Sequence, residues 1–282
     1  MRIGVVPGCH VVTATADNPR RIIMTDLTCP PATTAAEREV ADLLPIDAPE
    51  PACRAALAAV PFWCHTFALN RSADLYTAGS FRDHRYRIPF LPKDFHHKSV
   101  LDIGCLDGFY AFLAEARGAR RVVAIDNEEY VDAIRDRWGV TLAGGEGFHA
   151  IKELLRSEVE YRRIDAFASG ELTERFDFVY CCGILHRVEN PLGLLRIVRS
   201  RLEPDGTVLL ETYGCTGPGE AGATVQVWSP GEVIAGDNSL RWGFGAVALD
   251  KLARLAGLAT TGDTLTTMID GHPRIIATLR AV

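Results

Sequence analysis

The stretch that decides the fold reads Val100-Leu-Asp-Ile-Gly-Cys-Leu-Asp-Gly108. Residues 99–103 predict a buried strand that carries Asp102 near its end. Gly104 and Gly108 then form a turn whose backbone can pass close to a ligand, because glycine has no Cβ. Ligands of parallel α/β sheets bind beyond the carboxyl ends of the strands. The same turn also serves as a tight strand-to-helix connection, so it does not by itself specify a ligand.

Downstream of this turn, short apolar runs alternate with longer amphipathic stretches, which is typical of a parallel sheet covered on both faces. The expected strands are 99–103, 121–125, 159–164, 176–181 and 206–212, and the expected helices are 108–118, 129–138, 148–156, 191–202 and 249–256. Two last strands, 259–268 and 274–279, flank the turn Asp270-Gly271 and must therefore be antiparallel. The predicted fold class is α/β, a Rossmann-like seven-stranded sheet with helices on both faces.

The chain before residue 99 is patterned differently. Residues 1–60 predict a partly irregular extension, with an arm or disorder over 1–30 and one helix at 34–44 that Pro45, Pro49 and Pro51 end. Residues 61–98 predict a lid on the substrate side. No basic segment leads into a long apolar run, so we expect a cytoplasmic protein with neither a signal peptide nor a membrane contact.

Composition restricts the partners. The formal net charge is −6 and the pI is about 5.8, which does not favour a bulk electrostatic hold on nucleic acid. A local exception is the basic stretch 82–98, which is either a solvated segment or a contact for phosphate or carboxylate. The eight cysteines contain no CxxC pair, so we expect free thiols and no metal site.

Carboxylates follow the next two expected strands. Asp126 ends the second strand, about 20 residues after the glycine turn, where an acidic side chain can hold ribose hydroxyls. Asp165-Ala166 follows the third strand, where a carboxylate can meet an adenine amino group. Each aspartate alone could be a helix cap. Together at one sheet edge, they predict an adenosine site.

These residues resemble the class I S-adenosylmethionine-dependent methyltransferases. The acidic-glycine motif of that family is matched by Asp102, Gly104 and Gly108, with Leu106 in place of the middle glycine. The resemblance covers roughly residues 60–282 and implies a methyltransferase domain at 99–282, S-adenosylmethionine as the methyl donor and S-adenosylhomocysteine as the product. The implied cofactor contacts are Asp102, Gly104, Cys105, Asp107, Gly108, Asp126, Asn127, Asp165, Ala166, Cys182 and Gly183.

A narrower group, the enzymes that modify the wobble uridine of tRNA, is similar at three segments. These are Asp107-Gly-Phe109, Trp63-Cys-His65 and Gly183-Ile-Leu-His186. Arg187 stands where that group usually has histidine, and Ala78 replaces a proline. Some of these enzymes transfer a carboxymethyl group and hold its carboxylate with basic residues. That full basic set is not recognised here, so an ordinary methyl donor is expected.

Methyl transfer requires above all that the accepting atom, the methyl carbon and the sulfur are aligned. A base is needed only where the accepting atom must lose a proton. His186 is the first candidate base, because it follows the fourth strand, but it could equally make a structural hydrogen bond. His65 is the second, although it could only pack the lid. Arg187 could bind an anionic group of the substrate or pair with Glu189 or Glu211.

Aromatic residues suggest how a substrate is enclosed. Trp63, Phe67, Tyr76 and Phe81 could close over the pocket and exclude water, or they could serve only as packing. Further along, Asn238, Trp242 and Phe244 fall where relatives line the substrate side, whereas Trp228 is expected to pack.

Three functions remain open. The leading hypothesis is methyl transfer to an O, N or C atom of a small-molecule acceptor, which includes secondary metabolites. The second is modification of the wobble uridine of tRNA, which would want a basic surface. The third is a non-catalytic module that binds S-adenosylmethionine or S-adenosylhomocysteine. A homodimer is compatible with each of them.

Overall fold

The computed structural model describes residues 33–80, 84–127, 129–215, 222–229, 231–234, 237–262, 264–269 and 271–282. All of them belong to one compact unit, Ala32–Val282. The arm expected over residues 1–30 lies outside the described residues, as do Phe81, Arg82 and Asp270.

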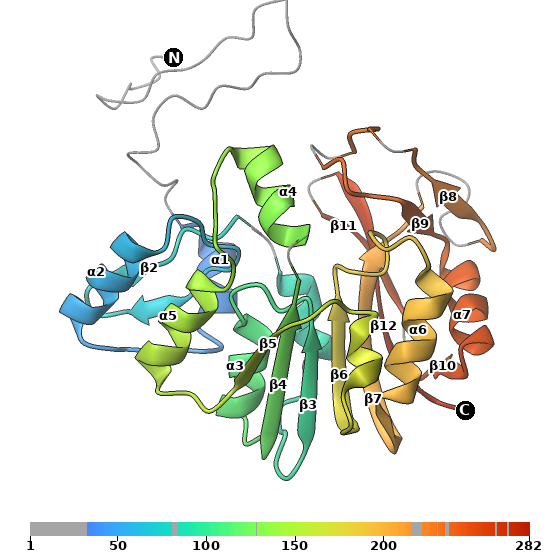
Figure 1. The fold of residues 1–282 in the computed structure, drawn as a ribbon, viewed down its shortest axis with the longest axis horizontal. Helices are drawn as coiled ribbons and strands as arrows, with labels where there is room; N and C mark the ends of the chain where they lie inside the picture. The colour runs from blue at the N-terminus through green and yellow to red at the C-terminus, as the bar shows by residue number, and fades with distance from the viewer. Residues whose placement is uncertain are drawn as a thin grey trace, which may run out of the picture. The chain divides into compact units, whose positions relative to one another are not determined.

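The central sheet is mostly parallel, as predicted (Figure 1). Its strands lie in the order β10-β12-β7-β6-β3-β4-β5, and β12 is antiparallel to its neighbour β7. The strands are β3 (Ser99–Ile103), β4 (Arg121–Asp126), β5 (Glu160–Arg163), β6 (Phe176–Cys182), β7 (Leu202–Tyr213), β10 (Leu258–Thr260), β11 (Leu265–Ile269) and β12 (His272–Ala281).

The edge of the sheet departs from the prediction of one long strand over 259–268. Two shorter strands, β10 and β11, both pair with β12 in antiparallel register. β10 lies opposite residues 279–281 of β12 and β11 lies opposite residues 272–276. Gly262 has a φ of +78° between them, so the chain leaves the ladder there and then rejoins it. The seventh strand is therefore present but interrupted.

Side chains alternate between the two faces of the sheet, and each face has its own core. Val100 and Ala124 pack on one face, with α3 (Phe109–Ala116) and α5 (Glu146–Leu155). Leu101 and Ile103 pack on the other, with α6 (Pro191–Ser200) and α7 (Ala246–Leu255). This period of two is what a strand buried on both faces requires. Helices on both faces are therefore confirmed (Figure 1).

The N-terminal part packs on the face that carries α3. It consists of α1 (Ala35–Ala41), α2 (Glu50–Ala59), β1 (Ala68–Asn70), β2 (Leu75–Tyr76) and the 3₁₀ helix η1 (Arg85–Phe90). Helix α2 corrects the expectation of an irregular stretch there. Pro49 caps it and Pro51 occupies its first turn, where a missing N–H breaks no hydrogen bond. The domain boundaries expected at residues 60 and 98 remain a prediction.

Four further elements lie near the carboxyl ends of the parallel strands. Helix α4 (Glu129–Trp138) follows β4, as predicted, and η2 (Ala168–Glu171) follows β5. The short strands β8 (Val225–Val227) and β9 (Trp242–Phe244) pair with each other and were not anticipated. Within the described part of the chain, each helix is too short or too polar to cross a bilayer.

A buried ion network joins the N-terminal part to the sheet. Glu211 on β7 has no exposed surface. Arg87 of η1 places Nη2 2.7 Å from its Oε2, and Arg274 of β12 places Nε 2.6 Å from its Oε1. Burial alone would raise the pKa of Glu211, but Arg274 and Arg87 outweigh burial and hold that pKa below its ordinary value. The network therefore stays ionised.

Replacing Glu211 with glutamine should lower the free energy of unfolding by about 3–5 kcal/mol, because two buried guanidinium groups would lose their counter-charge. Urea denaturation followed by circular dichroism measures the change. Glu203→Gln, on the same strand at a half-buried position, is the matched control and should change stability by less than about 0.5 kcal/mol. Equal losses in the two variants would contradict a special role for the network.

Candidate functional site

The carboxyl ends of the parallel strands bring the predicted residues to one edge of the sheet. Ile103 of β3 is in register with Ile125 of β4 and with Cys181 of β6. Asp126, at the end of β4, is opposite Arg163 of β5. The loops that follow these strands therefore start at one level and surround a common space beyond the sheet.

The glycine turn has the backbone that the sequence predicts. Gly104 and Gly108 have φ values of +75° and +82°, and the N–H groups of Gly104 and Cys105 both donate to the carbonyl of Ile125. A Cβ added at Gly104 would lie 2.2 Å from the Ile184 side chain. Glycine is therefore required there for space as well as for conformation.

Leu106, at the centre of the turn, adopts the left-handed conformation without being glycine, with a φ of +54°. Its N–H donates to Oδ2 of Asp126 over 2.6 Å. Oδ1 of Asp126 accepts from the Asn127 N–H at 2.9 Å. Each carboxylate oxygen keeps a lone pair beyond these bonds. Asp126 therefore holds the turn and can also accept from ribose hydroxyls.

Asp126, Asn127 and Asp165 form a continuous polar rim. The Asn127 side-chain amide donates to Oδ2 of Asp165 at 2.8 Å, and the Phe167 N–H donates to Oδ1 at 2.7 Å. The half-buried Ala166 lies in the chain between Asp165 and Phe167. The structure thus brings together the residues expected to hold the adenosine.

Asp102 is buried beneath this rim, with 4 % of its surface exposed. Its Oδ2 has no hydrogen-bond partner among the described residues. Burial, with Asp126 nearby, raises the pKa of Asp102 to about 7. Burial also raises the pKa of Asp126 to about 7. An unpartnered buried acceptor is unfavourable, so Asp102 fits a site that receives a hydrogen-bond donor from a ligand.

Asp107 points to the N-terminal part instead of the ribose side. Its Oδ2 accepts from the N–H groups of Cys64 at 2.7 Å and His65 at 2.9 Å. Its Oδ1 pairs with Nδ1 of His65. Asp107 was grouped with the cofactor contacts, and the structure places it as the attachment point for the segment around His65.

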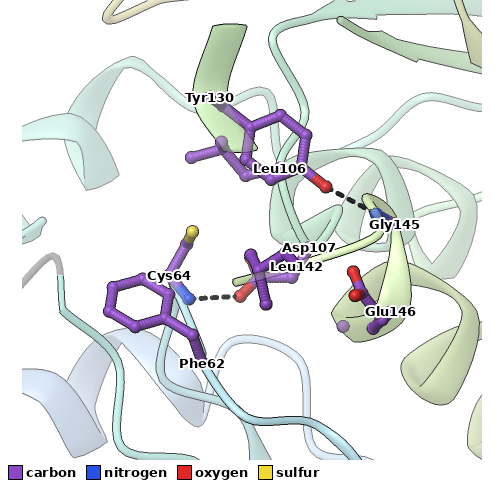
Figure 2. Close-up of a pocket in the computed structure, with 9 residues that line it drawn as sticks. Phe62, Cys64, Leu106, Asp107, Tyr130, Leu142, Gly145 and Glu146 are labelled. Carbon is purple, nitrogen blue, oxygen red and sulfur yellow. Dashed lines mark hydrogen bonds between the residues drawn. The ribbon is translucent and has the colours of Figure 1, made fainter. Parts of the chain in front are cut away.

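A small pocket lies beside this contact. Figure 2 shows Phe62, Leu106, Tyr130 and Leu142 around it, and the bond from the Cys64 N–H to Asp107 at one side. Tyr130 accepts a hydrogen bond from the Gly145 N–H at 2.5 Å. The lining combines these apolar side chains with the carboxylates of Asp107 and Glu146, and the pocket lies on the α4–α5 side of the glycine turn.

His186 is fully buried. Its Nδ1 lies 3.3 Å from the Tyr213 backbone N–H, which donates to it, and 3.2 Å from Oγ1 of Thr212. A ring nitrogen that accepts from a backbone N–H carries no proton, so in the neutral ring the proton is on Nε2. Burial, with Arg187 adding to it, lowers the pKa of His186 well below its ordinary value. The contacts of Nδ1 are structural, whereas Nε2 is buried without a partner among the described residues, so both alternatives for His186 stay open.

Arg187 does not pair with Glu189 or Glu211 as expected. Its Nη1 lies 2.8 Å from Oδ2 of Asp237 and also bonds Ser239, and its Nε donates to the Gly183 carbonyl at 3.1 Å. Glu211 is not available to Arg187 because Arg87 and Arg274 already contact its carboxylate. Arg187 therefore ties the loop after β6 to the segment before β9.

The aromatic residues expected to enclose a substrate have different environments, and the enclosure itself stays a prediction. Trp63 is 5 % exposed, and its Nε1 has no partner among the described residues. Tyr76 is half-buried under the guanidinium of Arg38 at 4.3 Å. Trp242 donates its Nε1–H to the Val188 carbonyl at 2.8 Å, whereas Asn238 is exposed. Phe67, Trp228 and Phe244 are buried, and Phe81 lies outside the described residues.

A polar cluster between the N-terminal part and the sheet was missed by the sequence analysis. The Tyr110 hydroxyl accepts from Nη1 of Arg87 at 3.0 Å and contacts Nδ1 of His84 at 2.9 Å. The Glu211 carboxylate reaches to 4.0 Å from the position that a Cβ of Gly183 would occupy. These partners are far apart in the chain, so no local spacing could have revealed them. The described residues contain no group of side chains suited to a metal ion.

Comparisons with known proteins agree with this geometry. A family model described as a methyltransferase domain matches residues 78–261. The tRNA U34 carboxymethyltransferase of Campylobacter hominis is 28% identical over 132 residues, which is 47% of this chain and 41% of that protein. The enzyme of the same name from Desulfotalea psychrophila is 31% identical over 127 residues, 44% of this chain and 35% of that protein. The alignments thus span about two fifths of those relatives.

Two solved structures share the fold. The N-terminal domain of EvdMO1, crystallised in the presence of S-adenosylhomocysteine (SAH) and D-fucose, has a TM-score of 0.54 and 19% identity, with 82% of this chain and 95% of that chain covered. TehB from Haemophilus influenzae has a TM-score of 0.50 and 13% identity, with 72% of this chain and 64% of that chain covered.

The family model spans more than half of the chain, and it falls on the strands, the glycine turn and the acidic rim described above. The chain therefore belongs to the methyltransferase-domain family and is an S-adenosylmethionine-dependent methyltransferase of the class I fold.

Proposed function

We propose that this enzyme methylates an O, N or C atom of a compact small molecule, and that the acceptor enters between the N-terminal part and the carboxyl edge of the sheet. The observation that carries this proposal is the placement of the described part of the basic stretch, residues 84–98, whose side chains form no continuous basic surface at that edge. A nucleic-acid substrate would want one.

The described residues of this stretch separate into two groups. Arg87 is buried in the ion network with Glu211, and Arg85 lies 3.9 Å from Glu39. Lys98 directly precedes β3, and its carbonyl accepts from Arg120, which directly precedes β4. Lys98, like His96 and His97, is therefore at the amino edge of the sheet, opposite the candidate site.

The donor fits the carboxyl edge. Asp126 would accept from the ribose hydroxyls and Asp165 from the adenine amino group, while the unpartnered Oδ2 of Asp102 would accept from the amino-acid end of the donor. A Cβ added at Gly183 would have only the Glu211 carboxylate near it, at 4.0 Å. The backbone at Gly183 therefore leaves space for the donor. When bound, S-adenosylmethionine supplies a methyl group on a sulfonium, and the protein aligns the acceptor with it.

An ordinary methyl donor is favoured over a carboxylated one. A donor with an additional carboxylate would need a cation to receive it. Glu211 contacts both Arg274 and Arg87 at short distances, and although the three groups keep one net positive charge, a donor carboxylate would have to draw a guanidinium away from this buried partner.

The direct experiment incubates the purified protein with methyl-labelled S-adenosylmethionine and either a small-molecule cell extract or bulk tRNA. We expect label in the small-molecule fraction. Label in tRNA, with binding that weakens steeply as salt rises, would favour the wobble-uridine alternative. Donor binding without transfer to either pool would favour the non-catalytic binding module.

Asp126→Ala should weaken SAH binding by about 1–3 kcal/mol, because ribose hydrogen bonds are lost. Isothermal titration calorimetry measures this. Asp132→Ala, at an exposed position of α4, should leave the affinity unchanged. An Asp126 variant that binds as tightly as the wild type would remove this carboxylate from the site.

Donor binding should release protons near pH 7. In the ligand-free protein the pKa values of Asp102 and Asp126 are raised to about 7, so both are partly protonated there. Hydrogen-bond donors of the ligand favour the carboxylate form and lower these pKa values. Affinity should therefore rise with pH up to about 7 and then level off.

Calorimetry in two buffers of different ionisation enthalpy counts the released protons. Asp102→Asn should reduce that count, and Asp94→Asn at an exposed position should not. Proton uptake on binding would show that the two buried aspartates do not face the ligand.

A further inference from the structure

We infer that His65 accepts the proton of the acceptor during methyl transfer and that Asp107 positions it. This inference rests on the proposed function. It also narrows the substrate class, because a base is needed only for an acceptor that carries an O–H or N–H group at the reacting atom.

The first support is the attachment of His65 to the glycine turn. Asp107 belongs to that turn and is adjacent to Gly108. Oδ2 of Asp107 accepts from two successive backbone N–H groups, those of Cys64 at 2.7 Å and His65 at 2.9 Å. Together with the pairing of Oδ1 and Nδ1, three contacts fix the imidazole relative to the donor-binding backbone.

The second support is the chemistry of the pair. A carboxylate that accepts from Nδ1–H holds a neutral histidine in the tautomer whose basic nitrogen is Nε2. The carboxylate also stabilises the imidazolium that forms when Nε2 takes up a proton. Asp107 is 4 % exposed, so water screens this interaction little.

The third support comes from the other two buried histidines at this edge. His186 carries its proton on Nε2, because the Tyr213 N–H donates to its Nδ1. His84 contacts the Tyr110 hydroxyl, and burial, with Arg87 adding to it, lowers the pKa of His84 well below its ordinary value. The contacts of His186 thus differ from the carboxylate–imidazole pair at His65.

The fourth support is the position of His65 next to the buried polar cluster. Its ring stacks on Phe109 at 5.8 Å and lies edge-on to Tyr110 at 5.7 Å and His84 at 5.4 Å. Tyr110 bonds Arg87, which bonds Glu211 beside Gly183. His65 thus belongs to the layer of polar groups that separates the N-terminal part from the donor edge.

The proposed step is balanced. The acceptor oxygen or nitrogen forms its bond to the methyl carbon while its proton passes to Nε2 of His65. The bond between that carbon and sulfur breaks, and its electron pair stays on sulfur in SAH. The His65 imidazolium, paired with Asp107, then returns its proton to water.

The deciding experiment is NMR of ¹⁵N-histidine-labelled protein with SAH bound, recorded at about pH 9, where an ordinary imidazole is neutral. The chemical shifts of the two ring nitrogens report the tautomer of His65. We expect the proton on Nδ1, where the Asp107 carboxylate accepts it, and a basic Nε2. Asp107→Ala should remove this preference, and a wild-type His65 with its proton on Nε2 overturns the inference.

Kinetics gives the second readout, with labelled S-adenosylmethionine and a panel of catechols, phenols and primary amines. His65→Gln should lower kcat by about 10²–10⁴-fold with little change in KM, and it should leave SAH affinity within about twofold. His97→Gln, at an exposed position of the opposite edge, is the matched control. Retained kcat in His65→Gln refutes the base, and if the panel shows no turnover the NMR result decides.

The outcome for SAH separates this inference from the proposed function. A wild-type protein that binds no SAH in calorimetry refutes the donor site, and with it the proposed function. A protein that binds SAH but has the wrong His65 tautomer refutes only the role of His65 and Asp107.

Discussion

The buried carboxylate of Glu211 is the constraint on which the arrangement of this molecule depends. It receives Arg87 from the N-terminal part and Arg274 from β12, and so it joins three segments that are distant in the sequence. Burying three charges is favourable only when each is paired, because desolvation is large. The N-terminal part therefore has one position in which Arg87 is satisfied, and that position places His65 and Trp63 beside the donor edge.

The candidate site follows from strand direction. Because β3, β4, β5 and β6 are parallel, the loops that carry Asp102, Asp126, Asp165 and Gly183 all leave the sheet at the same edge. Two of these carboxylates are buried enough to bring their pKa values to about 7. Two buried carboxyl groups with raised pKa values destabilise the folded state, and such groups are typical of functional sites. The folded protein retains them in the place where the family binds its donor.

The sequence analysis was most successful where the determining pattern is local. The strands at 99–103 and 121–125, and the glycine turn after Ile103, were predicted because a strand and its turn are specified within a few residues. Helix α2 was missed, since Pro49 and Pro51 were interpreted as breaks, whereas Pro49 is the N-cap residue and Pro51 lies in the first turn. The strand expected at 259–268 is interrupted, because the chain leaves the ladder near Gly262. Both errors concern the position at which a helix or strand begins or ends. That position is decided by only a few residues.

The sequence by itself determined the α/β class, the position along the chain of the parallel strands, and the acidic and glycine residues of the donor edge, because each depends on a short periodic or turn-forming segment. The spatial order of the strands in the sheet came only from the tertiary structure. Only the tertiary structure decided which partner each polar side chain takes. In the folded protein Arg187 pairs with Asp237, and His65 pairs with Asp107. The Tyr213 N–H donates to His186. Glu211 forms ion pairs with both Arg87 and Arg274. The reason is physical: a buried charge or imidazole is stabilised by whichever group folding brings within about 3 Å, and that group need not be near in sequence.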